Sequence, residues 1–177
     1  ARAREVEDSL SDALHEQLTQ RFVDRRAAAL IRRLDEAEAG EELLSAVTRR
    51  GEVVVEGHPV GTVAGFQFTP DPSAVGDEKK MVLRAARRAL REEMPRRIAR
   101  LEAAPDADIA LNPRHRVLWD GAEIARLRPG TAPHRPLVDV HASEFLDGPA
   151  REQVRARLQR WLDETIRRDL APLFDAS

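Results

Sequence analysis

The sequence predicts an α+β protein in which a long N-terminal helix precedes two tandem antiparallel β-meander/helix repeats. Three observations support this fold class. Apolar residues keep a helical spacing through the first segment, an alternating pattern replaces it after Gly40, and the order of short strands followed by a long helix then occurs a second time. These changes of pattern divide the chain into a bracing helix (1–40), a first repeat (41–104) and a second repeat (105–177).

The first predicted helix covers about residues 4–38. Its apolar positions recur every three to five residues, at Val6, Leu10, Leu14, Leu18, Phe22, Ala27, Leu30, Ile31 and Leu34. At the usual rise per residue such a helix is roughly 45 Å long or more, a length typical of helices that brace other elements. Gly40 is its expected end, because glycine readily takes the left-handed conformation at a helix C-terminus.

After Gly40 the apolar period is close to two, which predicts β-strands. The stretches Glu52–Glu56 and Val60–Phe68 flank a Gly-His-Pro turn and predict a β-hairpin, and Ser45–Thr48 adds a first strand to form a three-stranded meander. Pro70 and Pro72 end the last strand. A helix is expected over about residues 77–102, with Pro95 kinking or splitting it.

The second half of the chain repeats this plan. A shift of 64 residues aligns the strand pattern, and a shift of 72 aligns the helix pattern. The aligned pairs include Val53 with Val117, Glu56-Gly57 with Asp120-Gly121, Val60 with Ile124, Val82 with Val154, and Leu90 with Leu162. The eight extra residues fall in the Pro/Gly-rich loop 128–136. Chance matching of apolar and glycine positions is the alternative to an internal repeat.

Composition excludes several classes of protein. The formal net charge is -2, so the chain is not a general polyanion binder, and any nucleic-acid site must be a local patch. The absence of cysteine excludes disulfides, Cys-ligated zinc and a cysteine nucleophile, and fits a cytoplasmic protein. No apolar run approaches the roughly 18 residues of a membrane span, so no membrane partner is expected. Because the chain lacks an initiator Met and a signal-peptide core, we expect a piece of a longer protein.

Motifs for catalysis are missing from the sequence. Gly76–Lys80 has lysines but neither the glycine spacing nor the hydroxyl of a Walker loop, and no serine stands in a Gly-x-Ser-x-Gly turn. We therefore predict no enzyme activity and no cofactor for this chain.

His134, Asp139 and His141 form a conceivable metal cluster, but they lack a recognised ligand spacing, so an exposed strand face is favoured and no metal is predicted.

The strongest candidate site lies on the predicted middle helix. Arg84, Arg87, Arg88 and Arg91 share one face, with Lys80 one turn earlier, and such a row can track phosphates. The alternative is a solvated or salt-bridged face neutralised by Glu92, Glu93 and the acidic start of the long helix. The excess of arginine over lysine also fits a GC-rich genome. Phe66 and Phe68 are expected on one strand face, where they would stack on bases or, more commonly, fill a core.

Three stretches resemble a known family. They are Glu7–Arg26 (EDSLSDALHEQLTQRFVDRR), Gly51–Gly61 (GEVVVEGHPVG) and Gly65–Asp71 (GFQFTPD). They are similar to a region of the alphaproteobacterial superfamily-two DExH/D-type helicases, which are related to the mitochondrial RNA-degradosome helicase, and the region lies C-terminal to the ATPase core. The resemblance covers most of the chain; the long-helix motif is fairly specific, the hairpin moderately so, and the last third matches mainly by position.

The resemblance implies a non-catalytic accessory module of an ATP-dependent helicase. Its expected partners are the rest of the helicase chain and single-stranded RNA or DNA, which the sequence does not distinguish. The ATPase motifs of the family match no position here, so no catalytic residue is carried over. The alternative is a protein-docking or dimerisation module of the same larger protein without nucleic-acid contact, for which an exposed apolar patch is expected.

Overall fold

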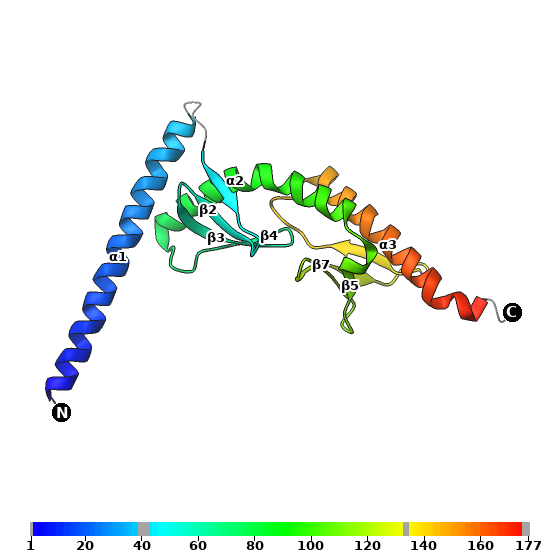
Figure 1. The fold of residues 1–177 in the computed structure, drawn as a ribbon, viewed down its shortest axis with the longest axis horizontal. Coiled ribbons are helices and arrows are strands. Elements are labelled where there is room, and N and C mark those ends of the chain that lie inside the picture. The colour runs from blue at the N-terminus through cyan, green and yellow to red at the C-terminus, as the bar shows by residue number, and fades with distance from the viewer. Residues whose placement is uncertain (1, 39–42, 133–134, 175–177) are drawn as a thin grey trace. The chain divides into compact units, whose positions relative to one another are not determined.

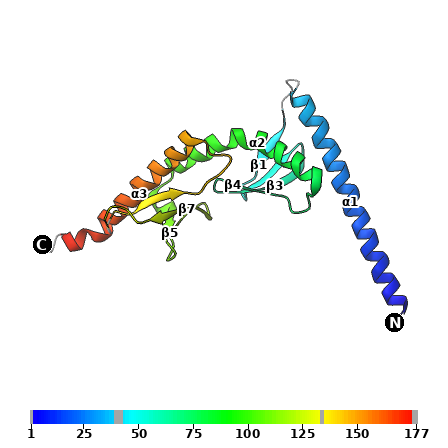
Figure 2. The same ribbon diagram turned by 180° about the vertical axis from the view of Figure 1, so that it is seen from behind.

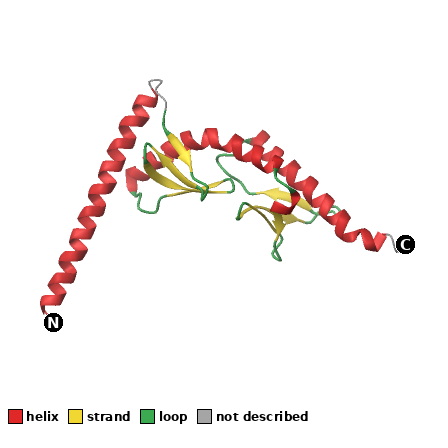
Figure 3. Ribbon diagram, viewed as in Figure 1, coloured by secondary structure: helices red, strands yellow, loops and turns green. Residues whose placement is uncertain are grey.

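The computed structural model describes residues 2–38, 43–132 and 135–174 (Figure 1). Over these residues the chain is mixed α+β, with an N-terminal helix, two antiparallel four-stranded sheets and further helices (Figure 3). The α+β class is therefore confirmed. The chain forms two compact units: unit 1 contains Ala1–Thr62 and Thr69–Ala89, and unit 2 contains Val63–Phe68 and Leu90–Ser177.

Helix α1 (Arg2–Glu38) has the length that its apolar spacing predicts, and the expected stop at Gly40 lies outside the described residues. Its second half packs in unit 1, where Leu30 and Leu34 are buried. Arg26 is buried beside them, with 1 % of its surface exposed. The blue first half of α1 stands clear of the rest of unit 1 in Figures 1 and 2, and its apolar side chains are exposed.

The first sheet consists of β1 (Ser45–Val47), β2 (Glu52–Val55), β3 (His58–Ala64) and β4 (Gln67–Pro70), in that order. The expectation of one strand over Val60–Phe68, and hence of a three-stranded meander, was wrong. The chain turns at Gly65-Phe66, where Gly65 has a φ of 56°. Glycine takes this left-handed conformation without steric cost, and a turn of only two residues joins the resulting strands.

Helix α2 (Gly76–Ala103) follows the first sheet and continues through Pro95 without a break. Proline removes one backbone N–H and leaves the carbonyl four residues earlier without its usual donor. Here Pro95 and Arg91 are both exposed, so water is available to that carbonyl. The buried apolar residues of α2 are Val82, Ala85, Ala86, Ala89, Leu90, Met94, Ile98 and Leu101.

The second sheet lies in unit 2 and has the same strand order as the first. A short 3₁₀ helix (Asp106–Asp108) leads into it, and helix α3 (Gly148–Phe174) follows it. Its strands are β5 (Ile109–Leu111), β6 (Arg116–Trp119), β7 (Ala122–Arg128) and β8 (Leu137–Val140). Phe66 packs in this unit and stacks on Trp119, with 5.9 Å between the ring centroids.

The two sheets pair their first strands in equivalent registers. Ser45 is opposite Val55, and Ile109, 64 residues after Ser45, is opposite Trp119. Each second strand has a register shift at the same place, between Val53 and Val54 and between Val117 and Leu118. The turns that follow both place an acidic residue in the left-handed region, Glu56 with a φ of 51° and Asp120 with a φ of 52°.

Candidate nucleic-acid interface

The five cations that the sequence singles out all lie on α2. Lys80, Arg87, Arg88 and Arg91 are exposed, whereas the Arg84 side chain is 39 % exposed. We call Lys80, Arg84, Arg87, Arg88 and Arg91 the α2 cationic row. The helix presents them because its small and apolar residues occupy the opposite face, which the core of the protein covers. Asp77 and Glu78 in the first turn favour the helix by opposing its dipole.

Lys80 and Arg84 lie beside acidic residues. The Nζ atom of Lys80 lies 2.9 Å from Oδ1 of Asp77, and this hydrogen bond raises the pKa of Lys80 and lowers the pKa of Asp77. The guanidinium of Arg84 lies 4.0 Å from Asp35 of α1. The Lys80–Asp77 pair is exposed and the Arg84–Asp35 pair is partly exposed. Such pairs contribute little stability because water screens them. The row is therefore partly neutralised, as the salt-bridged alternative expects.

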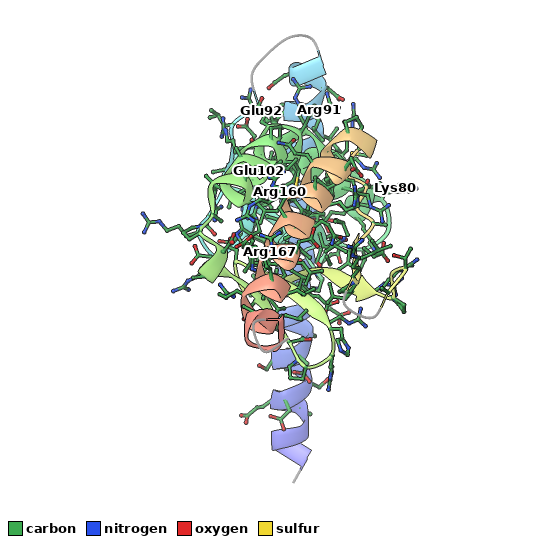
Figure 4. The ribbon with its side chains drawn as sticks, turned by 90° about the vertical axis from the view of Figure 1, so that its right-hand side faces the viewer. Lys80, Arg91, Glu92, Glu102, Arg160 and Arg167 are labelled. Carbon is green, nitrogen blue, oxygen red and sulfur yellow. The ribbon has the colours of Figure 1, made fainter. Side chains whose placement is uncertain are left out.

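The acids at the end of the row behave differently from each other. Glu92 is exposed next to Arg91 (Figure 4), whereas Glu93 lies 3.3 Å from the buried Arg97. Arg97 also donates a hydrogen bond of 3.0 Å to the carbonyl of Gly65. Burial lowers the pKa of Arg97, and the charge of Glu93 opposes this effect. Glu93 is therefore engaged with Arg97, whereas Glu92 is an exposed acid beside Arg91.

The arginines of α3 are more evenly balanced by acids. Arg160 pairs with Glu102 at 2.9 Å (Figure 4). Arg155 pairs with Glu152, and Arg167 pairs with Glu164. The buried Arg157 donates to the Ala104 carbonyl and to Asp106. Because these arginines are held by acids and a carbonyl, α3 is the weaker candidate for phosphate binding.

A cluster that the sequence did not single out lies in unit 2. Asp139 of β8 accepts from Arg126 at 2.9 Å and lies 2.8 Å from Arg128 and 3.7 Å from Arg151. The hydrogen bond from Arg126 and the three positive charges lower the pKa of Asp139. Three guanidinium groups around one carboxylate leave excess positive charge, which suits an oxyanion. The alternation of Arg126 and Arg128 along one strand was the available signal.

The conceivable metal cluster is not assembled by the described residues. Asp139 faces arginines, His141 lies 2.8 Å from Glu123, and His134 lies outside the described residues. Within the described parts of the chain, no group of three or more His, Asp or Glu side chains is placed to hold a metal ion. The two phenylalanines do not lie together on one strand, as the sequence predicted: Phe66 is buried in a turn, and Phe68 of β4 packs edge-on against Phe145. The core explanation therefore holds for Phe66.

The chain matches no protein-family model, no curated protein and no solved structure. None of the helices within the described residues combines the length and apolarity needed to cross a membrane.

Proposed function

We propose that this chain is a non-catalytic accessory module of an ATP-dependent helicase, C-terminal to its ATPase core, and that the α2 cationic row guides single-stranded RNA or DNA. The observation that carries the proposal is the exposure of Lys80, Arg87, Arg88 and Arg91 on one face of α2. The similarity of Glu7–Arg26 and of the first hairpin to the helicase region supplies the context.

The chemistry of the row suits a phosphate backbone. From Lys80 to Arg91 the helix rises about 16 Å, so its charges reach several consecutive phosphates of an extended strand. Arginine presents two parallel N–H donors to one phosphate, and each neutralised phosphate releases counterions. Such contacts position a strand without reading its sequence, which is what a guiding surface of a helicase requires.

The assignment to a helicase also bears on cofactors and on cellular location. ATP binding and hydrolysis belong to the rest of the helicase, so this chain needs no cofactor of its own, and the parent protein is cytoplasmic.

We also infer that the two sheet-and-helix halves are an internal repeat. The matching register shifts at Val53 and Val117, and the matching left-handed turns at Glu56 and Asp120, support this inference.

The test is a fluorescence-anisotropy titration with labelled single-stranded RNA and DNA at several salt concentrations. We expect micromolar binding that weakens steeply with salt. The triple variant Arg87→Glu, Arg88→Glu, Arg91→Glu abolishes it, while the charge-matched control Arg160→Glu, Arg167→Glu, Arg168→Glu on α3 retains most of it. No binding of the unaltered chain at low salt overturns the proposal. If both triple variants lose the same binding affinity, binding depends on net charge alone, and the proposed role of the α2 cationic row is overturned.

A second candidate function is protein docking or dimerisation without nucleic-acid contact. The observation that favours it is the row of exposed apolar residues on the first half of α1, since an exposed apolar patch marks an interaction surface. This surface shares no residue with the α2 cationic row. The titration above therefore separates the two functions.

A further inference from the structure

The first half of α1 carries five large apolar side chains in the open. Val6, Leu10, Leu14, Leu18 and Phe22 are between 54 % and 64 % exposed. We call these residues the α1 ridge. They follow one another at intervals of four residues, which is one of the rows along which helices pack against each other. The ridge is about 24 Å long, and an exposed apolar surface of this extent calls for a partner.

The ridge is not the face by which α1 holds its own unit. Arg26, Leu30 and Leu34 form that face, and all three are buried. At 100° per residue, Leu14 lies about 160° around the helix from Leu30 and about 200° from Leu34. The centre of the ridge therefore points to the opposite side of α1. Its last residue, Phe22, lies only about 40° from Arg26, and the Arg26 guanidinium is 6.0 Å from the centroid of the Phe22 ring. A partner at the centre of the ridge has access without displacing α1 from unit 1.

The ridge has nearly the same pattern in both chain directions. Leu14 is its centre, with Leu10 and Leu18 at equal distances and Val6 and Phe22 at its ends. A helix and its reversed copy therefore present matching apolar rows to each other. Such self-matching is the requirement for a two-fold interface between identical chains.

The charges beside the ridge select the direction of pairing. Residues 6–20 contain Glu7, Asp8, Asp12 and Glu16 but no lysine or arginine, whereas Arg21 and Arg25 follow. In a parallel pair the acidic segments repel each other. In an antiparallel pair centred on Leu14, Glu7 is opposite Arg21 of the second copy, and both lie within about 20° of Leu14 around the helix.

The antiparallel pairing also brings two negative charges to the same level along the helices, but both point away from the interface. The reversal about Leu14 places Asp12 at the level of Glu16 of the second copy. Both residues lie about 160° around the helix from Leu14, so they face solvent on the outer side of each helix. We propose that the α1 ridge packs antiparallel against the α1 ridge of a second copy of this chain, with Leu14 at the two-fold axis. This proposal names a second copy of the chain as the partner in the docking or dimerisation function, and it does not depend on nucleic-acid binding.

The first test is sedimentation equilibrium of the full 177-residue chain over a range of concentrations. We expect a monomer–dimer equilibrium in the micromolar range and its loss, by at least tenfold in affinity, in Leu14→Glu. The control Ser9→Glu adds the same charge about 140° around the helix from Leu14 and retains the dimer. Because both residues are exposed, far-UV circular dichroism of the two variants stays alike. A monomer at all concentrations, or equal effects of both variants, overturns the proposal.

The second test fixes the direction of the helices through disulfide formation, which the cysteine-free chain permits. In the antiparallel pair, position 10 of one copy is opposite position 18 of the other, whereas the two copies of position 10 are separated by about 12 Å along the axis. That separation exceeds the reach of a disulfide. A mixture of Leu10→Cys and Leu18→Cys chains therefore cross-links under mild oxidation, and either chain alone does not. Efficient cross-linking of Leu10→Cys with itself overturns the antiparallel arrangement.

Discussion

Arg26 of α1 donates a hydrogen bond of 2.7 Å from its Nε atom to Glu78 of α2, and both side chains are buried. The same guanidinium reaches Asp71 at 3.2 Å, Ser73 at 3.1 Å and the carbonyl of Pro59 at 3.4 Å. One arginine thus joins the long helix to the sheet, the following loop and the start of α2. Charge-assisted bonds of this kind are strong in a buried setting.

Removal of this arginine should release α1 from unit 1. Arg26→Ala leaves Glu78 buried without its counter-charge, a change that typically costs about 3–5 kcal/mol. The control is Arg25→Ala, since Arg25 is exposed and its replacement should alter stability by less than about 0.5 kcal/mol. Urea unfolding monitored by circular dichroism measures both free energies. Similar values for the two variants would show that the buried pair does not anchor the helix.

Stability should fall in acid through Asp71. Burial alone would raise the pKa of Asp71, but hydrogen bonds from Ser73 and the charge of Arg26 outweigh it and lower the pKa below the ordinary value of 3.8. A carboxyl group whose pKa is lower in the folded state stabilises the fold above the unfolded pKa, and this contribution is lost as the pH falls through the folded pKa. Asp71→Asn should therefore flatten the pH dependence of the free energy of unfolding below about pH 4. An unchanged acid profile in Asp71→Asn would contradict this assignment.

Gly65 should tolerate alanine poorly. Its φ is 56°, and an added Cβ would lie 2.5 Å from Cγ2 of Ile124. Gly121 has a φ of 72° but open space around an added Cβ, so Gly121→Ala measures the backbone effect alone. We expect Gly65→Ala to be less stable than Gly121→Ala by about 1–3 kcal/mol, the usual cost of overpacking. Thermal and chemical unfolding of the two variants provide the comparison, and equal stabilities would mean that Ile124 moves aside freely.

The salt dependence of binding should report how many charges of the α2 cationic row contact phosphate. For a single strand, each phosphate contact contributes about 0.7 to the slope of log affinity against log salt concentration. Arg87→Gln and Arg91→Gln should therefore each reduce the slope by about 0.7, and their combination by about 1.4. Weaker binding with an unchanged slope would place these two arginines outside the phosphate contacts.

Much of the fold was predictable from local patterns. The long helices follow from apolar spacing, and the strands before Val60 follow from alternation between glycine turns. The turn at Gly65-Phe66 was missed because a two-residue turn preserves the alternation of the flanking strands. The apolar pattern therefore continued unbroken from Val60 to Phe68 across a reversal of the chain.

The parts of the structure that depend on distant partners were not predictable. Arg26 stands among other arginines of α1 and has the appearance of a surface residue, and its acidic partners follow 45 and 52 residues later. Asp139 was noted for its spacing to His141, but its true neighbours come from β7 and α3. For the α2 cationic row, helical spacing was sufficient, because all of its members lie on one element.

Arg26 also separates two parts of α1 whose backbone hydrogen bonds differ in lifetime. From Arg26 onward the amides of α1 belong to a cooperative unit, and they exchange with solvent only when unit 1 opens. In the monomer the helix before Arg26 is supported by local propensity alone, and short isolated helices unwind on the microsecond scale or faster. At concentrations where the chain is monomeric, deuterium uptake should therefore change sharply near Arg26, with the exposed half exchanging early and the anchored half late.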